Sequence, residues 1–210
     1  MDWILSLDME LMRLINVQWT HAWLDLFFLI MASFHLWKWP LAAGAVAMLI
    51  WGGFKCRVFL VLMLLCLLIG DAGIVQIFKA SANRTRPHES HEDLRRVRFE
   101  GWTVTVERSE IREAERGNSM PSGHAANNFA LAIVASAVFG PWGRLVWIWA
   151  ILMAYSRVYT CDHYPSDVLM SLLIALVYAN SIVYISSLLW QKSGAKWFPK
   201  TYERHPQLIP

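Results

Sequence analysis

A histidine and an aspartate four residues apart lie where one apolar stretch of the sequence ends and the next begins. Pro165, a residue suited to the first position of a helix, predicts that Asp167 lies in the first turn of a helix and can reach back to His163. Such a carboxylate fixes the imidazole tautomer and stabilises its charged form, as in nucleophilic sites. Arg157 would add a guanidinium for an oxyanion. These residues alone are equally compatible with a helix terminus capped by Asp167 beside a solvated histidine.

Two other polar groups stand at the borders of apolar stretches. Lys79 and Arg86 follow a long apolar run, whereas Ser122, Gly123 and His124 open another one after a proline. A helix start offers unpaired backbone N–H groups to an anion. Taken singly, each group has an ordinary explanation, because lysine and arginine snorkel at membrane borders and a Pro-Ser-Gly start is a common helix cap.

Taken together, the three groups form an ordered pattern. It reads K-x6-R-P, then P-S-G-H, then S-R-x5-H-x3-D, and it extends from Lys79 to Asp167. In this pattern the chain resembles the type-2 phosphatidic acid phosphatase family of membrane lipid phosphatases, whose soluble relatives include vanadate-dependent haloperoxidases. All three motifs match without a departure.

The resemblance implies a reaction through a phosphohistidine. The groups that it assigns to phosphate binding are Lys79, Arg86, Ser122, Gly123 and Arg157. His163 would attack phosphorus and Asp167 would orient it, while His124 would protonate the leaving group and then activate water. Because cations neutralise the phosphoryl charge, no metal or other cofactor is expected, and vanadate should inhibit as a mimic of the transferring group.

The composition is that of a membrane protein. Of 210 residues, 56% are hydrophobic and 17% are charged, and the mean hydropathy is +0.36, against an apolar share of ~45–50% in soluble domains. Most of the twelve tryptophans lie near the ends of apolar runs, as in interfacial belts. The net charge of +3 gives no sign of a nucleic-acid partner, and the three cysteines suit packing better than a disulfide framework.

Apolar runs predict an all-α membrane protein with a six-helix transmembrane bundle. The runs lie at about 20–34, 39–52, 57–78, 125–139, 145–160 and 165–190. The expected organisation is an interfacial helix at 1–19, a transmembrane phosphatase domain at 20–190 with an outer-face insertion at 88–120, and a cytoplasmic tail at 191–210. The partners that follow are the lipid bilayer and a phosphorylated membrane lipid.

The first sixteen residues have the pattern of an amphipathic helix. Polar residues at positions 2, 6, 10, 13 and 16 leave apolar residues on the other faces, which favours a helix that lies on the membrane surface. The alternative is a helix packed on the flank of the bundle. Asp8 breaks the pattern.

Charge predicts the orientation. With six spans and a cytoplasmic N-terminus, eight cations stay inside against Lys38 alone in the short outer loop, and they are Arg13, Lys55, Arg57, Arg144, Lys192, Lys196, Lys200 and Arg204. The same count puts the motif residues on the outer face. We therefore expect a bacterial inner-membrane protein whose site faces the periplasm, with its N-terminus on the opposite side.

The insertion contains a predicted β-hairpin. Val97 and Phe99 alternate with charged residues before Gly101, and the alternation resumes after it. Residues 109–116 could add a short helix. The insertion either grips a lipid headgroup or merely closes the outer face.

The motifs recognise only phosphate, so the substrate rests on the resemblance. Undecaprenyl diphosphate is the first choice, because recycling of this carrier is the commonest role that the resemblance implies for small bacterial members. The alternatives are lipid A 1-phosphate, phosphatidylglycerophosphate or phosphatidic acid. A phosphotransferase that passes the group to another lipid would use the same residues. A transporter that binds anions without chemistry is disfavoured by the complete pattern.

Overall fold

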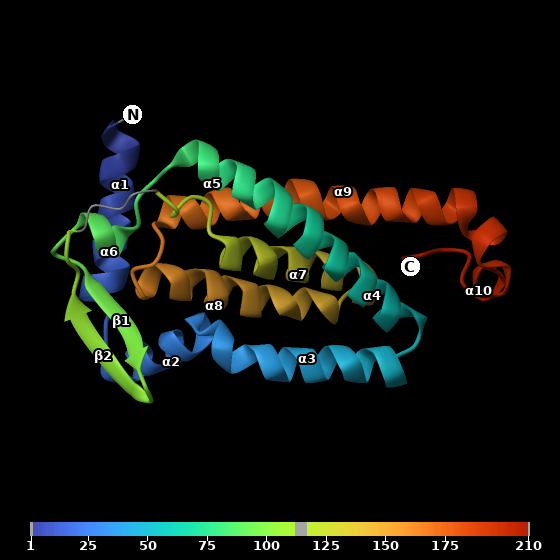
Figure 1. The fold of residues 1–210 in the computed structure, drawn as a ribbon, viewed down its shortest axis with the longest axis horizontal. Coiled ribbons are helices and arrows are strands. Elements are labelled where there is room, and N and C mark those ends of the chain that lie inside the picture. The colour runs from blue at the N-terminus through green and yellow to red at the C-terminus, as the bar shows by residue number, and fades with distance from the viewer. Residues whose placement is uncertain (1, 112–116, 210) are drawn as a thin grey trace.

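The computed structural model describes residues 2–111 and 117–209. Helices dominate it, and a single hairpin is appended at one end (Figure 1). The helices are α1 (Asp2–Arg13), η1 (Leu14–Gln18), α2 (Ala22–Ala32), α3 (Phe34–Trp51), α4 (Phe54–Leu65), η2 (Cys66–Val75), α5 (Gln76–Ala82), α6 (Pro87–Ser90), α7 (Gly123–Phe139), η3 (Gly143–Leu145), α8 (Val146–Tyr159), α9 (Pro165–Trp197) and α10 (Pro199–Arg204). The strands are β1 (Arg95–Glu100) and β2 (Thr103–Arg108).

Helix α7 forms the centre of the bundle and packs against α4, α8 and α9 (Figure 1). Its inward positions carry small side chains, such as Ala125, Ala130 and Ala132, which are fully buried. Small residues let helix backbones approach closely, which is how helices associate where lipid removes the hydrophobic driving force between them. The packing of α7 therefore holds the ends of its three neighbours in fixed relative positions.

The first two apolar runs form a bent pair. Helices α2 and α3 meet at an angle of 51°. Phe28 of α2 contacts Tyr155 near the end of α8, and Trp37 of α3 contacts Trp149 one to two turns earlier on α8. The pair therefore follows α8 in one antiparallel passage instead of folding back on itself.

The prediction of six spans is not confirmed. Among the described residues, two helices are long and apolar enough to cross a membrane, Phe54–Ser90 and Pro165–Trp197, and the bent pair would be a third span. The break lies at Ser33, whose backbone leaves the helical region and whose hydroxyl donates to the Leu29 carbonyl at 2.6 Å. Trp37 donates its indole N–H to the Ile30 carbonyl at 2.9 Å, so backbone groups at the break keep partners.

The N-terminal helix is confirmed, but it lies at the same end of the bundle as the motif residues (Figure 1). Asp8 binds Arg84 at 2.6 Å, and Arg13 binds Asp93 at 2.6 Å. The expectation that the N-terminus and the site lie on opposite faces is therefore wrong. Its cause is the miscounted α2–α3 pair, which crosses the bundle once.

The hairpin is confirmed. Val97 pairs with Val106 and Phe99 with Val104, and Gly101 at the tip has φ +61°. Its apolar face packs on α2 and on the end of α8, so the hairpin covers the same end as α1. Most of the short helix considered at 109–116 lies outside the described residues.

The C-terminal segment is helical and docked. Helix α9 continues to Trp197, and α10 follows at once. Trp190 donates its indole N–H to the His205 carbonyl at 2.9 Å, and the His205 ring stacks on Phe54 at 4.2 Å. The predicted tail thus packs against the end of the bundle opposite the hairpin.

Candidate active site

The start of α9 is built as predicted. Pro165 occupies the first turn, and Asp167 accepts the backbone N–H of Tyr164 at 2.9 Å, which completes a helix cap. This local bond fixes the carboxylate directly beside the residue that precedes the cap, His163.

His163 is 2% exposed, and its Nδ1 lies 2.7 Å from the carbonyl oxygen of Ser119. The Asp167 Oδ2 atom is farther from Nδ1, at 3.8 Å. A carbonyl oxygen can only accept, so Nδ1 carries the hydrogen and Nε2 keeps a lone pair. The direct partner of the imidazole is therefore a backbone carbonyl, and Asp167 stands behind it.

Asp167 is fully buried and is held by side chains from two loops. Ser119 donates its hydroxyl to Oδ2 at 2.5 Å, and Arg84 donates to Oδ1 at 2.7 Å. The N–H of Ser119 in turn bonds the Arg84 carbonyl at 2.8 Å. One segment thus supplies both the carbonyl for His163 and the hydroxyl for Asp167.

The predicted cations converge from separate elements. Lys79 on α5 lies within electrostatic range of Arg86 before α6 and of Arg157 on α8. Gly123 at the start of α7 adjoins them, because a Cβ there would lie 3.9 Å from Lys79 Nζ and 3.1 Å from Asp71 Oδ1. Glycine therefore leaves room beside the lysine.

Arg157 is buried and oriented by two groups. Its Nη1 donates to the Ala32 carbonyl at 3.1 Å, and its Nη2 pairs with Asp162 at 2.9 Å. Its Nε is buried and has no hydrogen-bond partner among the described residues. A buried donor without a partner costs free energy, so it marks a position where a ligand oxygen would fit.

Asp162 is a site residue that the sequence reasoning missed. It accepts the Thr160 hydroxyl at 2.7 Å and lies 3.9 Å from Arg86 as well as beside Arg157. Burial raises its pKa, but the Arg157 guanidinium and neighbouring groups outweigh this and hold the pKa at about 2. An ionised carboxylate therefore lies beside these cations.

Ser122 and His124 lie at the start of α7. Ser122 caps the helix by accepting the Ala125 N–H at 3.4 Å, and its own N–H points to the Asp167 carbonyl at 3.5 Å. His124 lies within electrostatic range of Arg157 and His163. All eight predicted residues are thus gathered at one end of the bundle.

Several side chains at this end of the bundle take part in these contacts but were not predicted as site residues. They are Asp8, Arg84, Ser119 and Asp162. Asp8 could have been noticed in the sequence, since it interrupts the amphipathic pattern of the first helix. Arg84 lies within the first motif, but its spacing did not distinguish it from a snorkelling cation.

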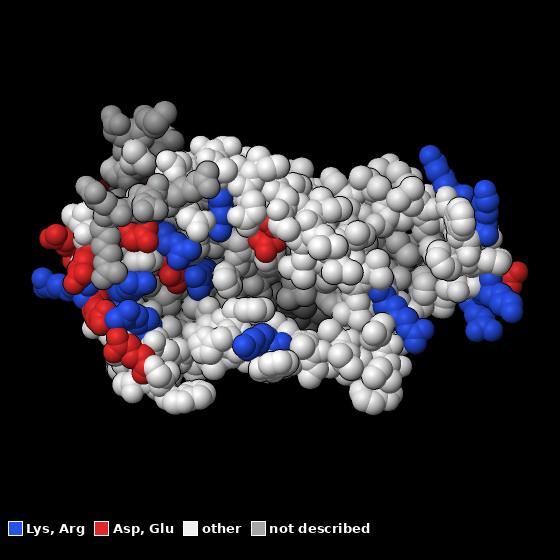
Figure 2. All heavy atoms as spheres, viewed as in Figure 1, with Lys and Arg blue, Asp and Glu red and all other residues white. Residues whose placement is uncertain are grey.

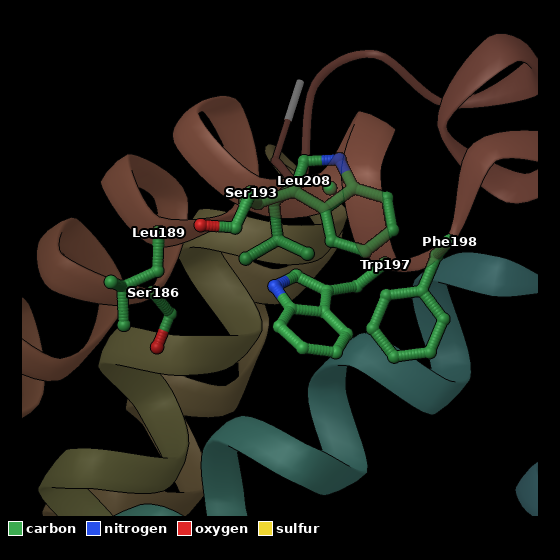
Figure 3. A pocket seen from close by; sticks show the side chains of 8 residues that line it. Ser186, Leu189, Ser193, Trp197, Phe198 and Leu208 are labelled. Atoms are coloured by element: carbon green, nitrogen blue, oxygen red, sulfur yellow. The ribbon is translucent and has the colours of Figure 1, made fainter.

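The described residues contain no group of three or more His, Cys, Asp or Glu side chains placed to hold a metal ion. A separate pocket of 280 Å³ lies at the opposite end of the bundle, between α9 and the C-terminal segment (Figure 3). Trp190, Trp197 and Leu208 are among its lining, which carries no charged side chain. It therefore has no cation that would neutralise a phosphate.

Comparisons with known proteins show the family of this chain. The sequence model of the PAP2 superfamily matches residues 58–191. The chain is 27% identical over 219 residues to the lipid A 4′-phosphatase of Porphyromonas gingivalis, covering 100% of this chain and 84% of that protein. The crystal structure of Aquifex aeolicus LpxE superposes with a TM-score of 0.62 at 25% identity, covering 85% of this chain and 95% of the other. Because the family match includes most of the chain and every motif, this protein belongs to the PAP2 superfamily and is a phosphatase.

Proposed function

We propose that this phosphatase removes a phosphate from lipid A, and that the 4′-phosphate is the preferred group. The similarity to a lipid A 4′-phosphatase extends over the entire chain and supports this choice. The first choice from sequence, undecaprenyl diphosphate, has no support from the comparisons, since the named relative acts on lipid A.

The chemistry that we propose uses His163 as the nucleophile. Its Nε2 lone pair attacks phosphorus, the bond from phosphorus to the sugar oxygen breaks, and His124 gives a proton to that oxygen. Water, deprotonated by His124, then displaces the histidine and releases inorganic phosphate. One observation carries this proposal, namely the 2.7 Å bond from Nδ1 to the Ser119 carbonyl, which leaves Nε2 free to attack.

The phosphoryl oxygens would be bound by five groups, which are Lys79, Arg86, Ser122, the N–H of Gly123 and Arg157. Charge spreads over these oxygens as the phosphorus–oxygen bond stretches, so cations placed in advance lower the barrier. The unpartnered Nε of Arg157 supports this role, because a phosphoryl oxygen would supply its missing acceptor.

We infer that the site faces the periplasm. The far end of the bundle carries an excess of cations over acidic groups, and its cations are Lys55, Arg57, Arg144, Lys192, Lys196, Lys200 and Arg204. Figure 2 shows basic side chains gathered at that end, whereas both signs mix at the site end. Short cytoplasmic segments are enriched in lysine and arginine, so the far end fits the cytoplasm. Arg13, which the sequence placed among the cytoplasmic cations, is not one of them, because it binds Asp93 at the site end.

The substrate is tested by phosphate release from matched detergent micelles. The panel contains lipid A with phosphate at the 1 position only, lipid A with phosphate at the 4′ position only, undecaprenyl diphosphate and phosphatidylglycerophosphate. We expect kcat/KM for the 4′-phosphate to exceed the others by about tenfold or more, since specificity is a difference in transition-state binding. A higher value for undecaprenyl diphosphate or phosphatidylglycerophosphate would reject the substrate and leave the chemistry intact.

A further inference from the structure

A chain of ion pairs leads from the N-terminal helix to the buried carboxylate behind His163. Arg84 donates through Nη2 to Asp8 Oδ2 at 2.6 Å and through Nη1 to Asp167 Oδ1 at 2.7 Å. Its guanidinium carbon also lies 3.7 Å from the centre of the Tyr164 ring. A planar guanidinium can bind two carboxylates and stack on a ring at once, which a lysine cannot do.

Asp8 is built into the active-site end of the bundle. It is 5% exposed, accepts the backbone N–H of Ser166 at 2.9 Å and accepts the Ser166 hydroxyl at 2.6 Å. A buried carboxylate is costly unless it is paired and hydrogen-bonded, and here every contact is with Arg84 or with the first turn of α9. Asp8 therefore caps the helix that carries Asp167.

The other buried residues of α1, and of η1 which continues it, contact other parts of the protein. Met12 is fully buried, and Asn16 donates to the Arg95 and Tyr159 carbonyls at 2.7 Å each. These contacts dock the helix on the hairpin and on α8. Among the described side chains of this helix, Asp8 is the one that connects to the Asp167 carboxylate behind the nucleophile, through the Arg84 guanidinium.

The Arg84 guanidinium is the partner of one of the two carboxylate oxygens of Asp167. Without this guanidinium, Oδ1 of Asp167 would be a buried anionic oxygen that has lost its side-chain partner among the described residues. Oδ2 would still accept hydrogen bonds from Ser119 and Tyr164. The carboxylate would then turn toward another donor and draw the Ser119 segment with it. Because the Ser119 carbonyl is the direct partner of His163, the imidazole would lose its orientation.

We propose that Asp8 and Arg84 are positioning residues for phosphoryl transfer, which hold Asp167 and the Ser119 segment so that Nε2 of His163 stays aimed at phosphorus. The inference rests on the proposed role of His163 and not on the identity of the lipid. It makes the N-terminal helix, which lies outside the three motifs, a part of the catalytic apparatus.

A matched control exists on the same helix. Arg13 also ties α1 to the rest of the protein, through an ion pair with Asp93 at 2.6 Å, but both side chains are half exposed and neither contacts Asp167. Arg13→Gln therefore removes a tether of α1 without touching the bridge. A general loosening of α1 and a specific loss of the bridge give different results in this comparison.

The test compares Asp8→Asn, Arg84→Gln, the double variant and Arg13→Gln in the full-length detergent-solubilised enzyme. Misplacement of a reacting group by about 1 Å can cost up to about 100-fold in rate. We expect kcat to fall about tenfold in Asp8→Asn and about 30- to 100-fold in Arg84→Gln. KM should stay within about twofold, because the phosphate-binding groups are unchanged.

Two further readouts separate positioning from folding. The double variant should be no slower than Arg84→Gln alone, since both changes break one chain of contacts. Arg84→Lys should recover part of the activity of Arg84→Gln, because an ammonium can pair with one carboxylate but cannot bridge two. Arg13→Gln should keep kcat within about twofold of the unmodified enzyme.

The proposal is overturned if Asp8→Asn keeps full kcat, if the two losses simply multiply in the double variant, or if Arg13→Gln is as slow as Asp8→Asn. Should Asp8→Asn not yield folded protein, the Arg84→Lys and Arg84→Gln pair decides, and equal activity of those two rejects the bridge. All rates use whichever lipid phosphate the unmodified enzyme hydrolyses best. A wrong substrate assignment would therefore change the assay lipid without changing these ratios.

Discussion

His163 is oriented by a backbone carbonyl, with the carboxylate four residues later in support. Asp167 is committed to Ser119, Arg84 and the Tyr164 N–H, so its distance of 3.8 Å from the imidazole is a consequence of those bonds. A backbone partner cannot be removed by a side-chain substitution. The tautomer should therefore survive changes at Asp167 better than the position of the ring does.

The pH profile is a prediction at this scale. Burial lowers the pKa of His163 from its ordinary value, and nearby Arg157 adds to the effect, although Asp167 opposes it. Protonation would remove the Nε2 lone pair, so a lowered pKa keeps the enzyme active at lower pH. We therefore expect no acidic loss of kcat/KM from protonation of His163 between pH 7.5 and about 6.5, and such a loss only below that. Titration of the micellar substrate by phosphorus NMR separates its own ionisation, and an enzyme pKa above about 7 would contradict the assignment.

Asp162 gives a second prediction. Its carboxylate is ionised and faces two of the cations that we assign to phosphate, so it opposes the binding of an anion. Removing one charge at a separation of a few ångströms is worth about 1 kcal/mol or more near a protein surface. Asp162→Asn should therefore tighten inhibition by vanadate about fivefold. Weaker inhibition would mean that the carboxylate serves mainly to hold Arg157 in place.

The residue types of the site were predictable because three motifs carry them, but their partners were not. Ser119 lies in the insertion and has no helical or strand periodicity around it, and Asp162 reads in the sequence as one of five unspecified positions between Arg157 and His163. The bridge from Asp8 to Arg84 joins residues 76 positions apart. Contacts of that range depend on how loops close over the bundle, which local patterns do not encode.

Elements with strong local signals were predicted well. The hairpin follows from alternation around Gly101, and the start of α9 follows from Pro165. The bend between α2 and α3 was not predicted, because hydropathy marks apolar stretches without showing whether a break reverses the chain. Ser33 and the following residues could have formed a turn, and only the contacts of both helices with α8 show that they do not.

The bend leads to a topology prediction. The Cys56→Ser background keeps two cysteines, Cys66 and Cys161, both buried. In it, Ser6→Cys, Glu92→Cys and Lys200→Cys each add one thiol at an exposed position on α1, on the insertion or on α10. We expect an impermeant thiol reagent to label the first two in intact spheroplasts and the third only after lysis. This follows because α1 and the insertion share one end of the bundle. Labelling of Ser6→Cys only after lysis would restore the six-span arrangement, in which the N-terminus and the site lie on opposite faces.

The motif residues and the docked C-terminal segment lie at opposite ends of the molecule. The motif residues, the hairpin and α1 gather at one end, and the docked C-terminal segment with its cations lies at the other (Figures 1 and 2). Apolar surface lies between the two ends, with exposed Leu, Ile, Val and Trp side chains along the helices. This division fits the proposed orientation, in which the site faces the periplasm.

The proposed reaction depends above all on a covalent bond between phosphorus and His163. The most direct measurement is a rapid alkaline quench during turnover, followed by mass spectrometry of the peptide that contains this histidine. We predict an acid-labile phosphoryl group on His163 in the unmodified enzyme. In His163→Ala the label should be absent, and phosphate release should fall by at least about 1,000-fold without loss of folded protein. A phosphoryl group on another residue, or near-normal phosphate release by His163→Ala, would contradict it.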